Sequence, residues 1–276
     1  MNKGYVLSRE QLLKDLYSAY YDARKHKRNK PYQKAFERQL DNHLRILCEE
    51  LWHRNYKPSP SSCFIIEDSK KREIFAAAFR DRIVHHLYYN YVHLMLERTF
   101  IHDSYSCIKG RGTHFGINRL EKHIQSESQN YTLPCYVLKI DIRGYFMHID
   151  RIKLLSIVTI ALKEMSKHRI SKYGRKRWRD VVDMDFISYL TYQLTTLDPI
   201  EECKMIGDPS DWHTLPHDKS LFYSQPNCGL PIGNLTSQLF SNVYMNTFDQ
   251  YVKRVLRCRH YGRYVDDAYF VSCDRE

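Results

Sequence analysis

The stretch Tyr261-Gly-Arg-Tyr-Val-Asp-Asp-Ala-Tyr-Phe-Val-Ser272 decides the fold class of this chain. Aromatic and β-branched residues make up most of positions 261–265 and 268–272, the composition of two short strands, and Asp266-Asp267 separates them. The pattern predicts a hairpin with two acids at its tip. Taken alone, the dipeptide is more typical of an ordinary Asp-rich turn.

A second candidate strand ends in an acid 266 − 141 = 125 residues upstream. Between Tyr136 and Ile142, one face would carry Tyr136, Leu138, Ile140 and Ile142 and the other Val137, Lys139 and Asp141. Such alternation predicts a half-buried strand with Asp141 on its accessible face. In one antiparallel sheet with the hairpin, this strand would add a third carboxylate to the pair. Like charges this close repel unless a cation lies between them, and two divalent ions about 4 Å apart can perform in-line phosphoryl transfer.

Apolar periodicity outlines the rest of the chain. Helical spacing is predicted for 10–56, 75–100, a segment capped by Asp150, and a segment after Asn234, and short extended pieces for 63–66 and 72–74. A glycine loop, Gly229-Leu-Pro-Ile-Gly233, leads into the last of these helices, where it can meet an anion or a backbone. The polar stretch 197–227 shows no period.

Composition favours a nucleic-acid partner without establishing one. The 276 residues carry 43 Lys+Arg and 32 Asp+Glu, a net charge of +11, together with 22 Tyr and 12 Phe. Positive charge and flat rings suit phosphates and bases, although a basic protein of no particular affinity has the same composition. The basic clusters at 24–30 and 167–179 are also typical of solvated surfaces. The longest apolar run, 154–162, is far shorter than the roughly 20 residues of a membrane span.

Eight cysteines without any Cys-x-x-Cys pair argue against a disulfide framework and favour a reducing cytoplasm. The only zinc-like grouping is Cys203, His213, His217 and Cys228, and its spacing is loose for a zinc site.

Together, Tyr264-Val-Asp-Asp267 and Lys139-Ile-Asp141 resemble the catalytic palm of reverse transcriptases. Further blocks follow the family's order: Arg72-Glu-Ile74 with Arg80-Asp-Arg82, Ser104-Tyr-Ser106 with Gly110-Arg-Gly-Thr113, and Gly229 to Asn242. In the last block, Ile232-Gly233 and Ser237-Gln238 stand where most reverse transcriptases have Gln-Gly and Ser-Pro. This form resembles the enzymes of diversity-generating retroelements, which copy a template-repeat RNA into cDNA with errors at adenines.

The resemblance implies roles residue by residue. Asp141 and Asp266 would be the primary ligands of two Mg²⁺ ions, replaceable by Mn²⁺, with Asp267 as a second acid that tunes the site. Phe146 would be the gate that excludes a ribose 2′-hydroxyl, although it also suits a core aromatic. Lys71 or Arg72, with Arg80, would bind the triphosphate. Both Arg80 and Arg82 also suit solvated or ion-paired helix residues, and for Arg82 this alternative is equally well supported. Ile232, Gly233, Ser237 and Gln238 would lie by the nascent base pair, and Lys109, Gly110 and Arg111 would contact nucleic acid.

The implied fold is α+β, with the fingers and palm of a right-hand polymerase and an antiparallel palm sheet flanked by helices. Residues 1–56 would be a basic helical extension, 57–134 the fingers, and 135–276 the palm, with a polar insertion at about 165–227. Because only nine residues follow Asp267, we expect an incomplete palm without a thumb, from a fragment or truncated reading frame.

The implied partners are template RNA, cDNA primer and product, dNTPs and an accessory variability protein, in a bacterial or phage-infected cytoplasm and without a membrane. Three alternatives stay open: a reverse transcriptase of a retron, intron or defence system, a non-catalytic RNA-binding fragment, and a metal-dependent nuclease.

Overall fold

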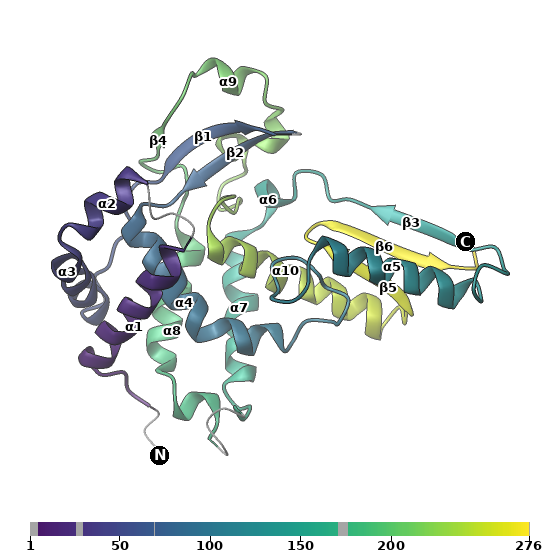
Figure 1. Ribbon diagram of the computed structural model, residues 1–276, viewed down its shortest axis with the longest axis horizontal. Helices are drawn as coiled ribbons and strands as arrows, with labels where there is room; N and C mark the ends of the chain where they lie inside the picture. Colours follow the sequence, from purple (N-terminus) through teal and green to yellow (C-terminus); the bar gives the residue numbers. More distant parts are fainter. Residues whose placement is uncertain (1–4, 26–29, 69, 171–175, 276) are drawn as a thin grey trace. The chain divides into compact units, whose positions relative to one another are not determined.

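The chain belongs to the α+β class, as predicted, and forms two compact units (Figure 1). The computed structural model describes residues 5–25, 30–68, 70–170 and 176–275. Unit 1 comprises Met1–Met95 and Phe146–Ser237, and unit 2 comprises Leu96–Tyr145 and Gln238–Glu276. Each unit is therefore discontinuous in sequence. The division into extension, fingers and palm concerns function and stays a prediction.

Unit 1 is mainly helical. Its larger helices are α1 (Arg9–Ala23), α2 (Pro31–Glu37), α3 (Leu40–Trp52), most of α4 (Phe79–Glu97), α7 (Arg151–Met165) and α8 (Met184–Thr196). Asp150 caps α7 as predicted, because its carboxylate accepts hydrogen bonds from the Ile152 and Lys153 amides. The region 10–56, for which helical spacing is predicted, forms three helices, with Pro31 in the first turn of α2, where its missing N–H costs nothing.

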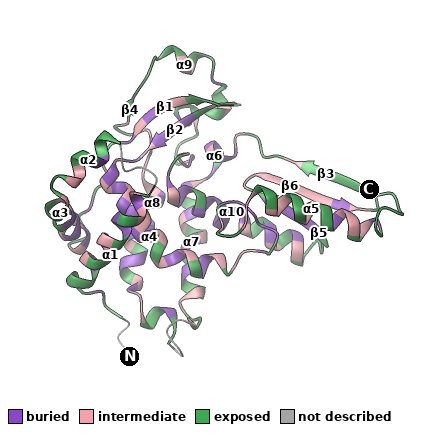
Figure 2. Cartoon of the chain, viewed as in Figure 1, coloured by how far each residue is buried: buried purple, intermediate pink, exposed green. Residues whose placement is uncertain are grey.

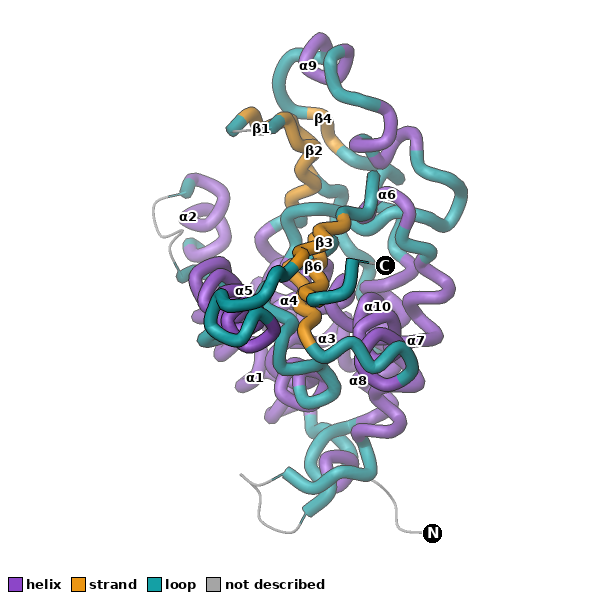
Figure 3. Tube along the Cα trace, turned by 90° about the vertical axis from the view of Figure 1, so that its right-hand side faces the viewer, coloured by secondary structure: helices purple, strands orange, loops and turns teal. Residues whose placement is uncertain are grey.

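A small sheet completes unit 1, with the order β2-β1-β4 (Figure 3). β1 (Ser62–Glu67) pairs antiparallel with β2 (Lys71–Ala76), which confirms the predicted extended pieces. Since 71–76 is committed to this hairpin, α4 starts at Phe79 and not at the predicted position 75. β4 (Lys204–Met205) adds a two-residue parallel edge.

The segment predicted as a polar insertion contains a core helix. α8 buries Phe186, Ile187, Leu190 and Leu194, so the polar insertion expected at about 165–227 includes a helix with an apolar buried face. The remainder of the segment follows the prediction more closely, with β4, the four-residue α9 (Ser210–His213) and single helical turns.

Unit 2 is built on an antiparallel sheet with the order β3-β6-β5. Its strands are β3 (Tyr136–Ile140), β5 (His260–Tyr264) and β6 (Asp267–Ser272), and its helices are α5 (Thr113–Glu127) and most of α10 (Leu235–Arg254). The four-residue α6 (Tyr145–His148) lies where the chain passes from unit 2 to unit 1.

The predicted half-buried face of β3 is wrong. Tyr136 and Leu138 are 45% and 60% exposed, and Val137 on the opposite face is 45% exposed (Figure 2). β3 is an edge strand of its sheet, so hydrogen bonds reach it from β6 alone. Alternation in the sequence therefore marks a strand here without marking a covered face.

Candidate active site

The two acids lie at the tip of the predicted hairpin, which the structure confirms. β5 and β6 are antiparallel and their pairing ends at Tyr264 and Asp267, so Val265 and Asp266 form a two-residue turn. Val265 has a φ of +59°, in the left-handed region that β-branched residues rarely adopt. The turn thus holds a strained backbone directly before Asp266.

β3 brings the third acid to the same place. Its antiparallel register with β6 pairs Ile140 with Ala268, and one further residue sets Asp141 opposite Asp267. This confirms the predicted antiparallel arrangement of the three carboxyl-bearing segments. Diagonally across the same two strands, the Lys139 ammonium lies 3.1 Å from the Asp267 carboxylate, while the register partner of Lys139 is Tyr269.

The electrostatics of the tip disfavour a bare carboxylate at Asp266. Burial raises the pKa of Asp266, and the like charges of Asp141 and Asp267 raise it further. A hydrogen bond from a backbone amide and the positive charge of Arg263 act in the opposite direction without cancelling the effect. A bound cation would relieve this repulsion and favour the ionised form of the site.

Arg263 links the turn to helix α10, a role that the sequence did not reveal. Its guanidinium is fully buried and binds Asp249 of α10 in a bidentate pair, at 2.8 Å from Nε and 2.7 Å from Nη2. The same guanidinium donates to the carbonyl oxygen of Val265 in the turn. Tyr261 also donates to Asp249, at 2.6 Å. The acidic turn is therefore anchored to α10 through a buried ion pair.

A tyrosine pair supports the hairpin on one face. The hydroxyls of Tyr105 and Tyr269 lie 2.7 Å apart. They lie over Gly262, where an added Cβ would come within 2.3 Å of Tyr105 and 2.6 Å of Tyr269. Segment 103–105 runs beside β5, since the Tyr105 amide donates to the Arg263 carbonyl at 3.0 Å. A glycine is thus required at 262 by close approach.

The donor set of the acidic tip fits Mg²⁺, which binds carboxylate oxygens and completes its shell with water and substrate phosphates. Over the described residues, no group of three or more His, Cys, Asp or Glu side chains is arranged to hold a metal ion, the three acids of the tip included. The same observation covers the zinc-like grouping: Cys203 packs on an apolar cluster of unit 1, and the His217 ring stacks on Tyr223 with centroids 3.9 Å apart.

The glycine loop lies along β2 in unit 1. The Phe75 amide donates to the Ile232 carbonyl at 2.9 Å, and the Asn234 side-chain oxygen accepts from the Ala77 amide at 3.3 Å. Gly233 has a φ of +121°, and an added Cβ would lie 3.0 Å from Ile74 and 3.2 Å from the Phe75 carbonyl oxygen. Glycine is therefore needed at 233 both for its backbone angle and for space.

The structure brings two distant candidates together beside this loop. Phe146 and Ile232 both pack on the core cluster of Cys63, Phe75, Met147 and Leu221. The Leu230 amide also donates to the Phe146 carbonyl at 2.8 Å. Phe146 is only partly buried, so its ring serves the core and still presents surface.

The basic candidates of unit 1 differ in what already binds them. Arg72 is exposed on β2. The Lys71 ammonium donates to Thr214 at 2.8 Å. Arg80 forms a bidentate pair with Glu50 and Arg82 donates to the Ala77 carbonyl at 2.8 Å, so both guanidinium groups stabilise unit 1. Of the four, Arg72 is the most exposed, and triphosphate binding stays a prediction for Lys71, Arg72 and Arg80.

Glu73 is a further residue that the sequence analysis did not assign. It is 1% exposed and accepts hydrogen bonds from Trp212, from the Ser220 hydroxyl and from the Leu221 amide. These bonds attach the irregular 197–227 segment to β2. The only feature of the sequence that could have drawn attention to Glu73 is the motif block Arg72-Glu-Ile74, in which it stands beside Arg72.

The remaining candidates are dispersed. Ser237 is buried in α10, and Gln238 is exposed on the same helix. Lys109 is exposed, Gly110 has a φ of +80°, and Arg111 donates to the Ile101 and Ser104 carbonyls at 3.2 and 2.9 Å. Of the two basic clusters, residues 26–29 and 171–175 lie outside the described residues.

No family model matches this chain, and a search of curated proteins finds no similar sequence. Across the described ranges, no helix has both the length and the apolar character required to cross a membrane.

Proposed function

We propose that this protein is an RNA-directed DNA polymerase with the fingers and palm of a right-hand polymerase. One observation carries the proposal: the β3–β6 register and the hairpin turn place Asp141, Asp266 and Asp267 at one end of one sheet. Carboxylates gathered at one edge of a sheet can hold divalent ions, and paired divalent ions catalyse in-line phosphoryl transfer. The motif blocks that resemble reverse transcriptases supply the substrate class.

The acids of unit 2 would hold the metal. Asp141 and Asp266 would be the ligands of two Mg²⁺ ions, with Mn²⁺ as a possible substitute and Asp267 as the weaker third acid. When bound, these ions would activate the attacking 3′-oxygen and stabilise charge on the leaving pyrophosphate. Arg263 acts as a positioning residue, because its bond to the Val265 carbonyl fixes the turn that presents Asp266.

The resemblance assigns the nucleotide contacts to residues of the loop and of β2, both in unit 1. Phe146 beside Ile232 offers an apolar surface that disfavours a ribose 2′-hydroxyl. Arg72 supplies an exposed positive charge for phosphate. In this role the catalytic contribution of unit 1 is positioning and charge stabilisation, as is usual for phosphoryl transfer.

Within reverse transcriptases, we assign the chain to the diversity-generating class on Ile232-Gly233 and Ser237-Gln238. Isoleucine neither donates nor accepts a hydrogen bond, so a polar check beside the nascent base pair is lost. Error-prone copying of a template-repeat RNA follows, with an accessory variability protein as partner. Replacing Ile232 with Gln should lower misincorporation opposite adenines, as read by sequencing the cDNA. An unchanged adenine error rate would contradict this assignment.

Primer extension on an RNA template with dNTPs and Mg²⁺ tests the activity. We expect extension by the unaltered chain and none by Asp266→Asn, while Glu121→Gln, which neutralises an exposed acid of the same unit, retains activity. Phe146→Val should admit ribonucleotides. A chain that binds RNA but does not extend a primer is the non-catalytic module, and RNA cleavage without synthesis identifies a nuclease.

A further inference from the structure

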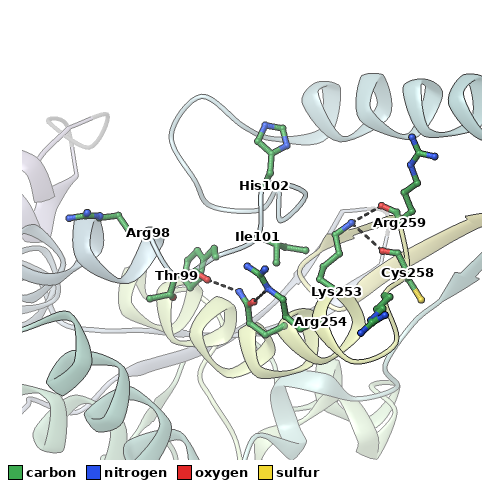
Figure 4. A pocket seen from close by; sticks show the side chains of 11 residues that line it. Arg98, Thr99, Ile101, His102, Lys253, Arg254, Cys258 and Arg259 are labelled. Carbon is green, nitrogen blue, oxygen red and sulfur yellow. Dashed lines mark hydrogen bonds between the residues drawn. The ribbon is translucent and has the colours of Figure 1, made fainter. Parts of the chain in front are cut away.

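A basic pocket lies in unit 2, at the opposite end of the β5–β6 hairpin from the acids. It has a volume of about 590 Å³ and is lined by 98–102, from the loop after α4, and by residues of the 250–259 segment. Figure 4 shows Arg98 and Arg259 toward opposite sides, with α10 between them. The strand β5 separates Arg259 from the acidic turn. At the usual rise per residue, this distance is on the order of 15 Å.

The charged side chains that line this pocket are all positive. Five of its lining residues are Lys or Arg, namely Arg98, Lys253, Arg254, Arg257 and Arg259, and among the described lining residues none is acidic. Gathering like charges costs free energy, so the arrangement calls for an explanation.

Only part of that charge is accounted for by local bonds. The Lys253 ammonium donates to the carbonyls of Cys258 and Arg259, at 3.3 and 2.7 Å, and thereby closes the turn after α10 (Figure 4). The Arg254 guanidinium donates to the side-chain oxygen of Gln250 at 3.3 Å, and because Gln250 is neutral this bond does not neutralise the positive charge of Arg254. Arg254, Arg257 and Arg259 are exposed.

From this geometry we infer that the pocket binds the sugar–phosphate backbone of single-stranded RNA, outside the proposed catalytic site. Arginine is the residue best suited to phosphate, because its planar fork of donors matches phosphate oxygens. Phe100 and His102 add rings to the lining, on which a base can stack. An acidic peptide would gain from the charges but not from the rings, so the lining favours nucleic acid.

The wild-type chain carries its own reporter, because Cys258 lines this pocket. A single-stranded RNA of about 12 nucleotides, within the usual site size for such binders, should protect Cys258 from a maleimide, as measured by mass spectrometry. Cys273, exposed in the same unit and outside the pocket lining, is the internal control. Equal protection of both thiols, or protection of neither, overturns the inference.

A charge-matched pair of variants gives the second measurement. Arg254→Ala/Arg259→Ala removes two cations of the pocket, and Lys122→Ala/Arg275→Ala removes two exposed cations of unit 2 outside it. The first should weaken RNA binding roughly tenfold and reduce the slope of log K against log salt by about 1.4, and the second should do neither. Equal losses in both variants contradict a defined site.

Competition distinguishes the sources of the anion. Tripolyphosphate that displaces RNA and protects Cys258 as well as RNA does would assign the pocket to free phosphates, and polyglutamate that does so would assign it to an acidic protein. Either result overturns the inference. No primer or dNTP is present, so failure here leaves the polymerase proposal standing, and absence of primer extension leaves this binding site standing.

Discussion

The acidic turn of unit 2 and the glycine loop of unit 1 are held in place by different forces. Behind the turn lies a buried ion pair, Arg263 with Asp249, and the guanidinium reaches the turn itself. The loop depends on main-chain hydrogen bonds to β2 and on the packing of Ile232 in an apolar cluster. A buried charge pair tolerates almost no rearrangement, because separating its members leaves an uncompensated charge. Apolar packing tolerates small shifts, which suits a surface that must accept different base pairs.

Arg263→Met should break the first support and have the largest effect. Removing one member of a buried ion pair costs about 3–5 kcal/mol, because Asp249 remains charged and buried. Urea unfolding measures the loss. The double variant Arg263→Met/Asp249→Leu should recover most of the stability and still lack primer extension, since the Val265 carbonyl has lost its donor. A single variant that loses less than about 1 kcal/mol would show that the pair does not anchor the turn.

Gly233→Ala should break the second support at a smaller cost. Alanine at a φ of +121° is strained, and its Cβ would approach the Phe75 carbonyl oxygen to 3.2 Å. We expect a loss of about 1–3 kcal/mol in urea unfolding. Gly110→Ala is the matched control, because Gly110 also has a positive φ but an added Cβ would meet nothing within 4 Å. Equal losses at both positions would mean that backbone strain alone matters and that the contact with β2 does not.

Local patterns in the sequence located the acids of the turn and the glycines of the loop, but they did not locate the contacts that support them. The hairpin and its acids are coded by adjacent residues, so they could be found without a structure. The Arg263–Asp249 pair joins a strand to a helix, and nothing in either segment alone indicates it. Strand alternation found β3 but could not show that its faces are open, because cover depends on other elements.

Helix α8 was missed for a different physical reason. Its buried stripe includes Thr191 and Thr195, which look polar in the sequence. Each hydroxyl donates to the carbonyl four residues earlier, at 2.8 and 2.7 Å, so the helix itself satisfies these groups. Polar residues that bond within their own helix can therefore line a core.

Asp266→Asn should stabilise the fold in metal-free buffer, whereas Arg263→Met and Gly233→Ala should destabilise it. The pKa of Asp266 is raised in the folded chain by burial and by Asp141 and Asp267. The folded state therefore binds its proton more tightly than the unfolded state, and the stability gained from the proton is lost as pH rises through that pKa. In metal-free buffer at neutral pH, the variant should melt a few degrees higher than the wild type. Thermal unfolding with and without Mg²⁺ measures this.

Mg²⁺ should raise the melting temperature of the wild type and leave Asp266→Asn nearly unchanged, since the ion offsets the repulsion that the substitution removes. Glu121→Gln, at an exposed acid away from the turn, should show neither effect. A variant that melts lower than the wild type in metal-free buffer would contradict the idea that the acids repel one another in the folded chain.

Lys139→Gln should have the smallest effect on folding. The Lys139–Asp267 pair spans 3.1 Å, but the two side chains are 69% and 44% exposed, and surface pairs of this kind contribute about 0.2–1 kcal/mol. The loss in urea unfolding should vanish near 1 M salt, where charges are screened beyond about 3 Å. The loss from Arg263→Met should persist under the same conditions, because a buried pair is screened far less. A loss from Lys139→Gln that survives high salt would contradict this expectation. It would show that the Lys139–Asp267 pair supports the acidic turn in the same way as the buried Arg263–Asp249 pair.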